Sequence, residues 1–363
     1  MRLFISTLFI LLNPFISNAQ VAPDWYKTFT GKAGNMNTTL HLTKSGENYS
    51  GYIWFEQNQW PMSFYYGGKI AKTDSISLEA ASGPLSITLT GILDSAQFNG
   101  YSILQKNYKG SKKAAFHLGV SNDKTYTPME YIYTTGSAKL PAKLKNESTC
   151  EYNAGTVWPI ENNSAAIALK KEINKMLGTK STSKEPSAWL KEEKNKFIKS
   201  WLKDNSKLTP KDASEMGMSL SVQMDNRILV MYENEHTITL ANYDFSYTGG
   251  AHGNSATSLI DINKHTGKVI QLADVLTPEG IKALPVFLDK IARLQYGITN
   301  NKPLDQNNFF VKKIEPSKEF YVTSTGIGFL YPPYALKSFA DGEVNLLIPF
   351  SALKTYLQPA FRK

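Results

Sequence analysis

The stretch YTGGAHGN, residues 247–254, places a histidine among three glycines between two runs of strand-forming residues. His252 could serve as a general base, as a metal ligand or as a hydrogen-bonding strut. A metal ion needs two or three further ligands, but His236 and His265 lie on separate predicted strand or turn positions and form no close-spaced ligand pair. The chain also lacks HExxH and paired CxxC motifs. The sequence therefore predicts no metal and no other cofactor.

Nucleophilic and phosphate chemistry lack their usual residue patterns as well. No GxSxG elbow is present, and nothing in the sequence around the single cysteine, Cys150, would activate a thiol. The GGAHG run lacks both the lysine-serine ending of a P-loop and the glycine spacing of a dinucleotide site. We therefore predict no catalytic residue and a protein that is not an enzyme. Four carboxylates could still pair in the folded chain and keep a hydrolase as an alternative: Asp24, Asp244, Asp261 and Glu343.

The glycines themselves indicate a structural corner. Glycine suits positive φ and close backbone approach, and a glycine-rich corner joins two strands through a wide turn or bulge. His252 would then hydrogen-bond the corner shut. Two tyrosines, Tyr331 and Tyr334, flank Pro332-Pro333. Their rings could pack in the core or protrude from the surface and contact a partner. The candidate partner-binding residues are Tyr247, His252, Tyr331 and Tyr334.

Residues 1–19 are typical of a secretory signal peptide. Arg2 precedes about ten apolar residues, and the small-residue pattern Asn18-Ala19-Gln20 predicts cleavage near Ala19. No segment approaches the roughly 18 unbroken apolar residues that a spanning helix needs. We therefore expect an exported protein, periplasmic or extracellular, with no transmembrane segment in the mature chain. One cysteine allows no internal disulfide, so burial of a core must stabilise the fold.

The formal charge of +9 comes almost entirely from lysine, since arginine occurs only at Arg2, Arg227, Arg293 and Arg362. Bidentate recognition of phosphates and bases relies on arginine, which argues against nucleic acid as a partner. The charge is concentrated in residues 139–204, where 13 lysines face 8 acidic residues and leave +5. Such a surface attracts anionic polymers or is simply a solvated helix face. The candidate anionic-polymer-binding residues are Lys191, Lys194, Lys196, Lys199 and Lys203.

Residues 20–138 predict an antiparallel β-barrel or sandwich. About eight short runs of alternating apolar and polar residues are separated by turns of glycine, asparagine, aspartate and serine. A barrel of this size either holds a small apolar ligand or is filled by its own side chains.

The rest of the chain predicts an α+β half in which helices pack on an antiparallel sheet. In residues 150–242, helical spacing of apolar residues predicts helices over 165–177, with Ser164 as N-cap, and over 187–205. A hairpin that turns at Asp225-Asn226 follows. In residues 243–360, strands flank the glycine corner, a long helix begins near Pro278, and further strands complete the sheet. The predicted fold class is α+β.

Three motifs in residues 243–360 resemble a known family. YTGGAHGN, then LIDINKHTGKVIQLADVL, then GFLYPPYALKSFADGEVNLLIPFSALKTYL follow the order typical of the RsiV-type C-terminal domain. Residues 150–242 look like the companion domain that precedes it, so the resemblance covers roughly residues 150–360. Residues 20–138 are only vaguely lipocalin-like. That family forms the ectodomain of the lysozyme-sensing anti-sigma factor of bacilli and precedes the catalytic domain of some peptidoglycan deacetylases.

The resemblance implies a binding role without catalysis. Neither a sigma-binding segment with a membrane span nor a deacetylase domain with its Asp-Asp motif and histidine ligands accompanies the shared portion. We therefore expect an exported, non-catalytic envelope protein that recognises a muramidase-like protein or a cell-wall polymer. Two alternatives stay open: a hydrolase that uses the four carboxylates on cell-wall material, and a carrier of a small apolar ligand in the N-terminal barrel.

Overall fold

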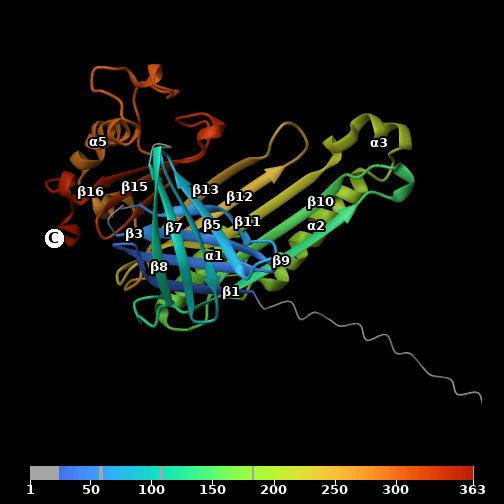
Figure 1. Ribbon diagram of the computed structural model, residues 1–363, viewed down its shortest axis with the longest axis horizontal. Helices are drawn as coiled ribbons and strands as arrows, with labels where there is room; N and C mark the ends of the chain where they lie inside the picture. Colours follow the sequence, from blue (N-terminus) through green and yellow to red (C-terminus); the bar gives the residue numbers. More distant parts are fainter. Residues whose placement is uncertain (1–23, 57–59, 107–108, 182–183, 363) are drawn as a thin grey trace, which may run out of the picture.

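The computed structural model describes residues 24–56, 60–106, 109–181 and 184–362. Figure 1 shows a β-barrel, two further sheets and the helices that flank them. The predicted signal peptide, residues 1–19, lies outside the described residues. Within the described ranges, no helix is long and apolar enough to cross a membrane. The fold class is α+β, as predicted.

Eight strands form a closed antiparallel barrel in which each strand pairs with the next along the chain. β1 closes the barrel by pairing with β8, where Phe29 lies opposite Val120. Alternate residues face inward, so that in β6 every second residue from Leu85 to Gly91 is buried. The strands are β1 (Trp25–Ala33), β2 (Met36–Ser45), β3 (Asn48–Phe55), β4 (Met62–Lys69), β5 (Ser75–Ser82), β6 (Leu85–Leu93), β7 (Gln97–Lys106) and β8 (Lys109–Val120).

Large apolar side chains fill the barrel interior. Phe29, Phe55, Phe98 and Phe116 are fully buried there. The rings of Phe98 and Phe116 meet edge to face with their centroids 4.7 Å apart, a geometry worth about 0.5–1.5 kcal/mol beyond burial alone. Of the two predicted alternatives for the barrel, the structure shows the one filled by its own side chains.

A five-stranded sheet in the order β13-β12-β11-β10-β9 lies beside the barrel (Figure 1). Its strands are β9 (Met129–Lys139), β10 (Thr149–Pro159), β11 (Val222–Glu233), β12 (Thr237–Tyr247) and β13 (Asn254–Asn263). β10 and β11 run parallel, with Cys150 opposite Val222, because the chain makes a helical crossover between them. This pair is the exception in a sheet that was predicted to be antiparallel. β9, in the range 20–138, pairs with β10.

The predicted hairpin at Asp225-Asn226 is wrong. β11 runs without a turn from Val222 to Glu233, and Asp225 pairs with Phe245 on β12. A polar pair is tolerated inside this strand because Asp225 forms an ion pair with Arg227 on the same strand. Residues two apart in a strand share a face, so the two side chains satisfy each other.

The crossover contains the helices α1 (Ser164–Met176), α2 (Ser187–Asp204) and α3 (Pro210–Met216). Asn163 caps α1 by accepting a hydrogen bond from the Ala166 amide, so the predicted cap at Ser164 is one residue late. α2 packs across β9 and β10, and its Trp201 donates a hydrogen bond to the Leu220 carbonyl at 2.9 Å. Trp201 therefore anchors the end of the lysine-rich helix.

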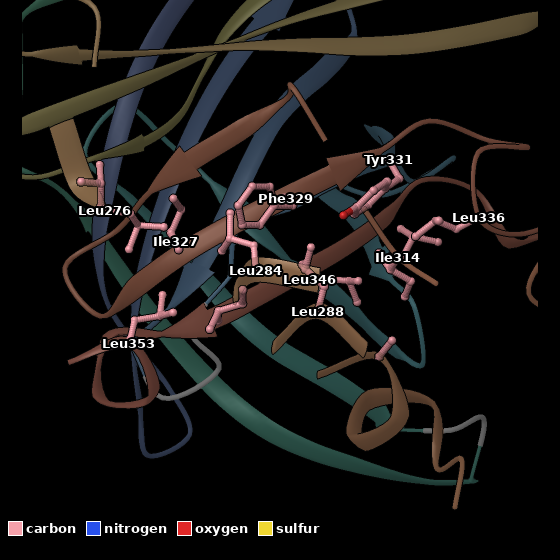
Figure 2. Packing of buried hydrophobic residues seen from close by; sticks show 14 of the residues in the cluster. Leu276, Leu284, Leu288, Ile314, Ile327, Phe329, Tyr331, Leu336, Leu346 and Leu353 are labelled. Atoms are coloured by element: carbon pink, nitrogen blue, oxygen red, sulfur yellow. The ribbon is translucent and has the colours of Figure 1, made fainter. Parts of the chain in front are cut away.

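The C-terminal part packs helices on a three-stranded sheet of β14 (Phe320–Val322), β15 (Gly326–Tyr331) and β16 (Val344–Pro349). The long helix α5 (Pro278–Tyr296) begins where predicted, capped by Thr277. Figure 2 shows Leu284 and Leu288 of α5 lying over Phe329 and Leu346 of the sheet. The remaining short helices are η1 (Ala142–Leu144), η2 (Gly217–Leu220), α4 (Leu272–Val275), η3 (Leu304–Gln306), η4 (Phe339–Asp341), α6 (Phe350–Leu353) and η5 (Pro359–Phe361).

Polar groups join the barrel to the sheets. The Lys264 ammonium lies 2.6 Å from Oε1 of Glu233, which also accepts hydrogen bonds from the backbone and side chain of Thr127. Arg227 of β11 donates to the Ser50 hydroxyl of β3. Of these contacts, the one between Arg227 and Ser50 joins the two halves, whereas Lys264, Glu233 and Thr127 hold the end of the five-stranded sheet to the segment before β9.

Candidate ligand cleft

A cleft of about 550 Å³ lies where the barrel, the five-stranded sheet and the segment 330–345 meet. We call it the central cleft. Its volume falls within the roughly 300–1,000 Å³ of small-ligand pockets, which are common where domains meet. Residues from distant parts of the sequence line it, among them Tyr65 of β4, Tyr243 of β12 and Phe339 of η4.

An ion pair occupies the side of the cleft formed by β11. The Arg227 Nε donates to Oδ1 of Asp225 at 2.6 Å, Nη2 donates to Oδ2, and Nη1 donates to the Ser50 hydroxyl. Burial has the largest single effect on Arg227 and lowers the pKa of the guanidinium, but the charge and hydrogen bonding of Asp225, together with Tyr131 and Tyr133, outweigh it and raise the pKa. Three of the five N–H groups of Arg227 are therefore engaged within the protein, and the residue is a tie between the two halves.

Glu343 presents an unsatisfied acceptor at the cleft. Its Oε1 is buried and has no hydrogen-bond partner among the described residues. Burial raises the pKa of the Glu343 carboxyl, and hydrogen bonds from Thr257 oppose the rise. Buried polar atoms are almost always paired, so this oxygen keeps an unused acceptor position, which a ligand hydroxyl or amide would reach only by displacing the atoms that cover it.

Tyr243 is affected by the charges of two of the three acidic groups of the cleft, Asp225 and Glu343. Burial raises the pKa of its hydroxyl, and the charges of Asp225 and Glu343 raise it further, while Arg227 lowers it. Asp225, Glu343 and Tyr243 thus form one polar cluster with two carboxyl groups in different surroundings. The arrangement can accept several hydrogen bonds from a neutral, hydroxyl-rich ligand.

Phe339, which lines the cleft, belongs to a cluster of three aromatic rings. The rings of His252 and Phe339 stack with centroids 4.2 Å and planes 22° apart, and Tyr334 lies 5.8 Å from Phe339. The Tyr334 hydroxyl lies 3.4 Å from Nε2 of His252. We call these three residues the aromatic rim. Tyr334 has a φ of 69°, an unfavourable conformation for a residue with a side chain.

The structure separates the four predicted partner-binding residues. His252 and Tyr334, 82 residues apart, meet on the surface in the aromatic rim. Tyr331 is buried, and its hydroxyl donates to the Glu315 carbonyl at 2.8 Å, which makes it a core residue (Figure 2). The Tyr247 hydroxyl donates to the Gly250 carbonyl at 3.0 Å and closes the glycine corner. A binding role for His252 and Tyr334 stays a prediction.

Gly249 packs this corner against η2. It has a φ of +85°, and a Cβ there would lie 2.3 Å from the Ser219 carbonyl oxygen. Gly250, with a φ of +111°, has no atom within 4 Å of such a Cβ. The corner therefore needs glycine at Gly249 for close approach as well as for its backbone conformation.

The five predicted lysines of α2 lie in different surroundings. Lys196 is paired with Glu192 at 3.0 Å and Glu193 at 2.9 Å. The alkyl stem of Lys194 lies over Gly136 of β9. The lysines that stay exposed without an ion pair to described residues are Lys191, Lys199 and Lys203.

Two histidines that seemed separate in the sequence lie together. Nδ1 of His236 is 3.1 Å from Nε2 of His265, because the turns that carry them are neighbours at one end of the sheet. Their separation in the sequence gave no sign of this contact. The described residues nevertheless contain no group of three or more histidine, cysteine or acidic side chains that could hold a metal ion.

The four carboxylates considered in the sequence do not gather in the central cleft. Glu343 lines it, whereas Asp261 is buried between sheets and accepts a hydrogen bond from Thr239. Asp24 accepts a hydrogen bond from the Gly46 amide at a turn, at 3.2 Å. The cleft's other partly buried acid, Asp225, escaped notice because its segment was predicted to be a turn.

Comparisons with known proteins match two parts of the chain. Residues 273–351 match the family described as a protein of unknown function (DUF3298). Residues 145–255 match the family described as deacetylase PdaC. Each covers less than half of the chain, so the chain is similar to these families over the matched segments. The finer RsiV-type identification stays a prediction. No match was found among curated proteins.

Two solved structures match the chain over about two thirds of its length. A member of the DUF3298 family from Bacteroides fragilis superposes with a TM-score of 0.58 and 21% identity, over 65% of this chain and 96% of that one. A DUF3298 family protein from Pseudomonas aeruginosa gives a TM-score of 0.40 and 16% identity, over 64% of this chain and 96% of that one. The first match shows a shared fold.

Proposed function

We propose that this chain is an exported, non-catalytic envelope protein that binds a cell-wall glycan in the central cleft. The observation that carries the proposal is the combination of a polar cluster with an unsatisfied Glu343 oxygen and a rim of aromatic rings. Sugar rings have apolar faces that pack on aromatic rings, and hydroxyl and amide groups that hydrogen-bond to carboxyl and phenol groups. Pockets that combine apolar walls with a few placed polar groups are typical binding sites.

The lysines of α2 supply a weaker, separate attraction. Lys191, Lys199 and Lys203 face solvent on a helix outside the cleft. Anionic wall polymers would be drawn to them through a field that salt screens within about 10 Å at 0.1 M ionic strength. Binding through the cleft is therefore expected to resist salt, while binding through α2 is expected to depend on it.

The family resemblance supports a second ligand, a muramidase-like protein. A protein partner needs about 800 Å² of surface on this chain, more than the enclosed cleft presents, so contact would have to spread across the aromatic rim and the neighbouring turns. The cleft geometry favours the glycan.

Binding measurements test the proposal directly. The chain from Gln20 onward is titrated with chitotetraose and sedimented with purified peptidoglycan, at low and at physiological salt. We expect saturable, salt-resistant binding that Glu343→Gln weakens, while Glu279→Gln, an exposed change on α5, leaves it unaltered. Binding to immobilised lysozyme alone would replace the glycan with a protein partner.

One observation favours a hydrolase as the second candidate. Asp225, ion-paired with Arg227, and Glu343, whose pKa is raised by burial, are carboxyl groups of one cleft in different surroundings. Enzymes that cleave glycosidic bonds use such a pair as base or nucleophile and as acid. Release of soluble fragments from labelled peptidoglycan, abolished by Glu343→Gln, would identify this chemistry.

A further inference from the structure

A second cavity, of about 500 Å³, lies between the turns that carry His236 and His265 and the C-terminal segment 350–362. We call it the C-terminal pocket. It shares no lining residue with the central cleft. Its charge is also different, since its lining contains Lys354 and Arg362 and no acidic residue. The central cleft is lined by three acidic residues and one arginine.

Arg362 differs from the other arginines in the described part of the chain. Arg227 is held by both oxygens of Asp225, and Arg293 by both oxygens of Asp289. Arg362 instead donates from Nε to the Leu357 carbonyl at 2.7 Å. Its two Nη atoms bond to no described residue, and neither it nor Lys354 makes an ion pair there. The guanidinium is thus fixed beside the cavity with its donors free for an anion.

The two histidines form a further polar wall. Their contact at 3.1 Å fixes the rings relative to each other, with centroids 5.4 Å apart. The nearest carboxylate, Glu235, lies 3.1 Å from Nε2 of His236 and does not line the pocket. His265 and Glu235 thus engage the two ring nitrogens of His236, and the carboxylate of Glu235 stays outside the pocket lining.

Apolar residues of the C-terminal segment form another side of the pocket. Phe350 and Phe361 lie with ring centroids 6.0 Å apart, and Leu357 is buried beneath the segment. All three line the pocket together with Val322 of β14. The cavity thus offers an apolar surface and two unpaired cations within one space.

We propose that the C-terminal pocket binds a single-chain amphiphilic anion, with the alkyl chain on Phe350, Leu357 and Phe361 and the carboxylate or phosphate head group on Lys354 and Arg362. Charge complementarity carries the assignment, since a cation or a neutral alkyl chain would leave both cations unpaired. The proposal is independent of glycan binding in the central cleft.

Calorimetry tests the proposal with two defined probes, decanoate and decyl phosphate, each below its micelle concentration. Both carry the proposed chemistry, and a preference for one identifies the head group. We expect one saturable site. Lys354→Gln combined with Arg362→Gln should weaken binding roughly tenfold or more. The matched control combines Lys282→Gln with Lys290→Gln, which removes the same charge from exposed positions of α5 and should change binding by less than about twofold.

Three outcomes would overturn the assignment. The first is equal weakening in the pocket and control variants, which would show a general charge effect. The second is equal binding of decyltrimethylammonium, which has the chain but the opposite charge. The third is an absence of saturable binding by both anions. Thermal unfolding of each variant establishes that the compared proteins are folded.

Discussion

The ring of His252 stacks on the ring of Phe339, which joins the glycine corner between β12 and β13 to η4 across 87 residues of sequence. His252 is exposed and Phe339 is half-buried, and their rings, with centroids 4.2 Å apart, stack beside the polar cleft that Phe339 lines. The same contact gives the GGAHG motif a place in the candidate site.

Replacing Phe339 with alanine should weaken chitotetraose binding about tenfold, because truncation of an aromatic anchor removes its contact and leaves His252 unsupported. Phe310→Ala is the control, since that ring is 57% exposed and does not line the cleft. Calorimetry measures both affinities. Similar losses in the two variants would argue against the aromatic rim.

Gly249→Ala should lower the free energy of unfolding by about 1–3 kcal/mol more than Gly250→Ala. Both glycines have positive φ, but only at Gly249 would the added Cβ meet backbone, the Ser219 carbonyl. Urea unfolding of the two variants isolates the cost of the close approach. Equal effects would mean that the corner can move away from η2.

Lys264→Met should destabilise the fold by about 3–5 kcal/mol, because it leaves Glu233 buried without its cation. The Glu233 side chain is fully inaccessible and that of Lys264 is 14% exposed. Lys196→Met, at a solvent-exposed pair, should have a much smaller effect. Adding Glu233→Gln to Lys264→Met should restore part of the loss; a further loss would refute the explanation by an unpaired charge.

Asp261 should make the protein less stable as pH rises. Burial raises the pKa of this carboxyl from 3.8 to about 8, against hydrogen bonds from Thr239 and Val322 that lower it. The folded chain then holds a proton that the unfolded chain has released, so the free energy of unfolding falls between about pH 4 and pH 8.

Asp261→Asn removes this titration and should gain stability relative to the wild type as pH increases across that range. Urea unfolding at the two ends of the range measures the difference. Asp74→Asn, at an exposed turn, serves as control and should follow the wild-type pH profile. Parallel profiles for wild type and Asp261→Asn would show that Asp261 is ionised in the folded chain.

Local patterns were enough to predict the barrel and α5. A strand with one buried face shows a period of two, as in β6, and a helix that begins at Pro278, directly after the cap Thr277, shows its start in the sequence. The parallel pairing of β10 with β11 has no such local sign, because it depends on a crossover of 62 intervening residues, 160–221. Only the packing of the folded chain decides which strand lies beside β10 in the sheet.

The central cleft could not be predicted from the sequence for a similar reason. Its polar cluster takes Asp225 from β11, Tyr243 from β12 and Glu343 from the segment before β16. One signal was available: Asp225 and Arg227 are two residues apart, the spacing that places opposite charges on one strand face. Interpreting the region as a turn concealed it.

The pairing order of the barrel also bears on the order in which the chain folds. Each of its strands pairs with its neighbour in sequence, and the closing contact between β1 and β8 needs nothing beyond Val120. β10 must wait for β11, whose last residue is Glu233. Domains fold as units from the N-terminus during synthesis, and non-local pairing is slow. We therefore expect the barrel to form first and to act as the template on which the later sheet docks, so that a nascent chain halted near residue 200 carries a finished barrel and a β10 that is paired with β9 but still lacks β11.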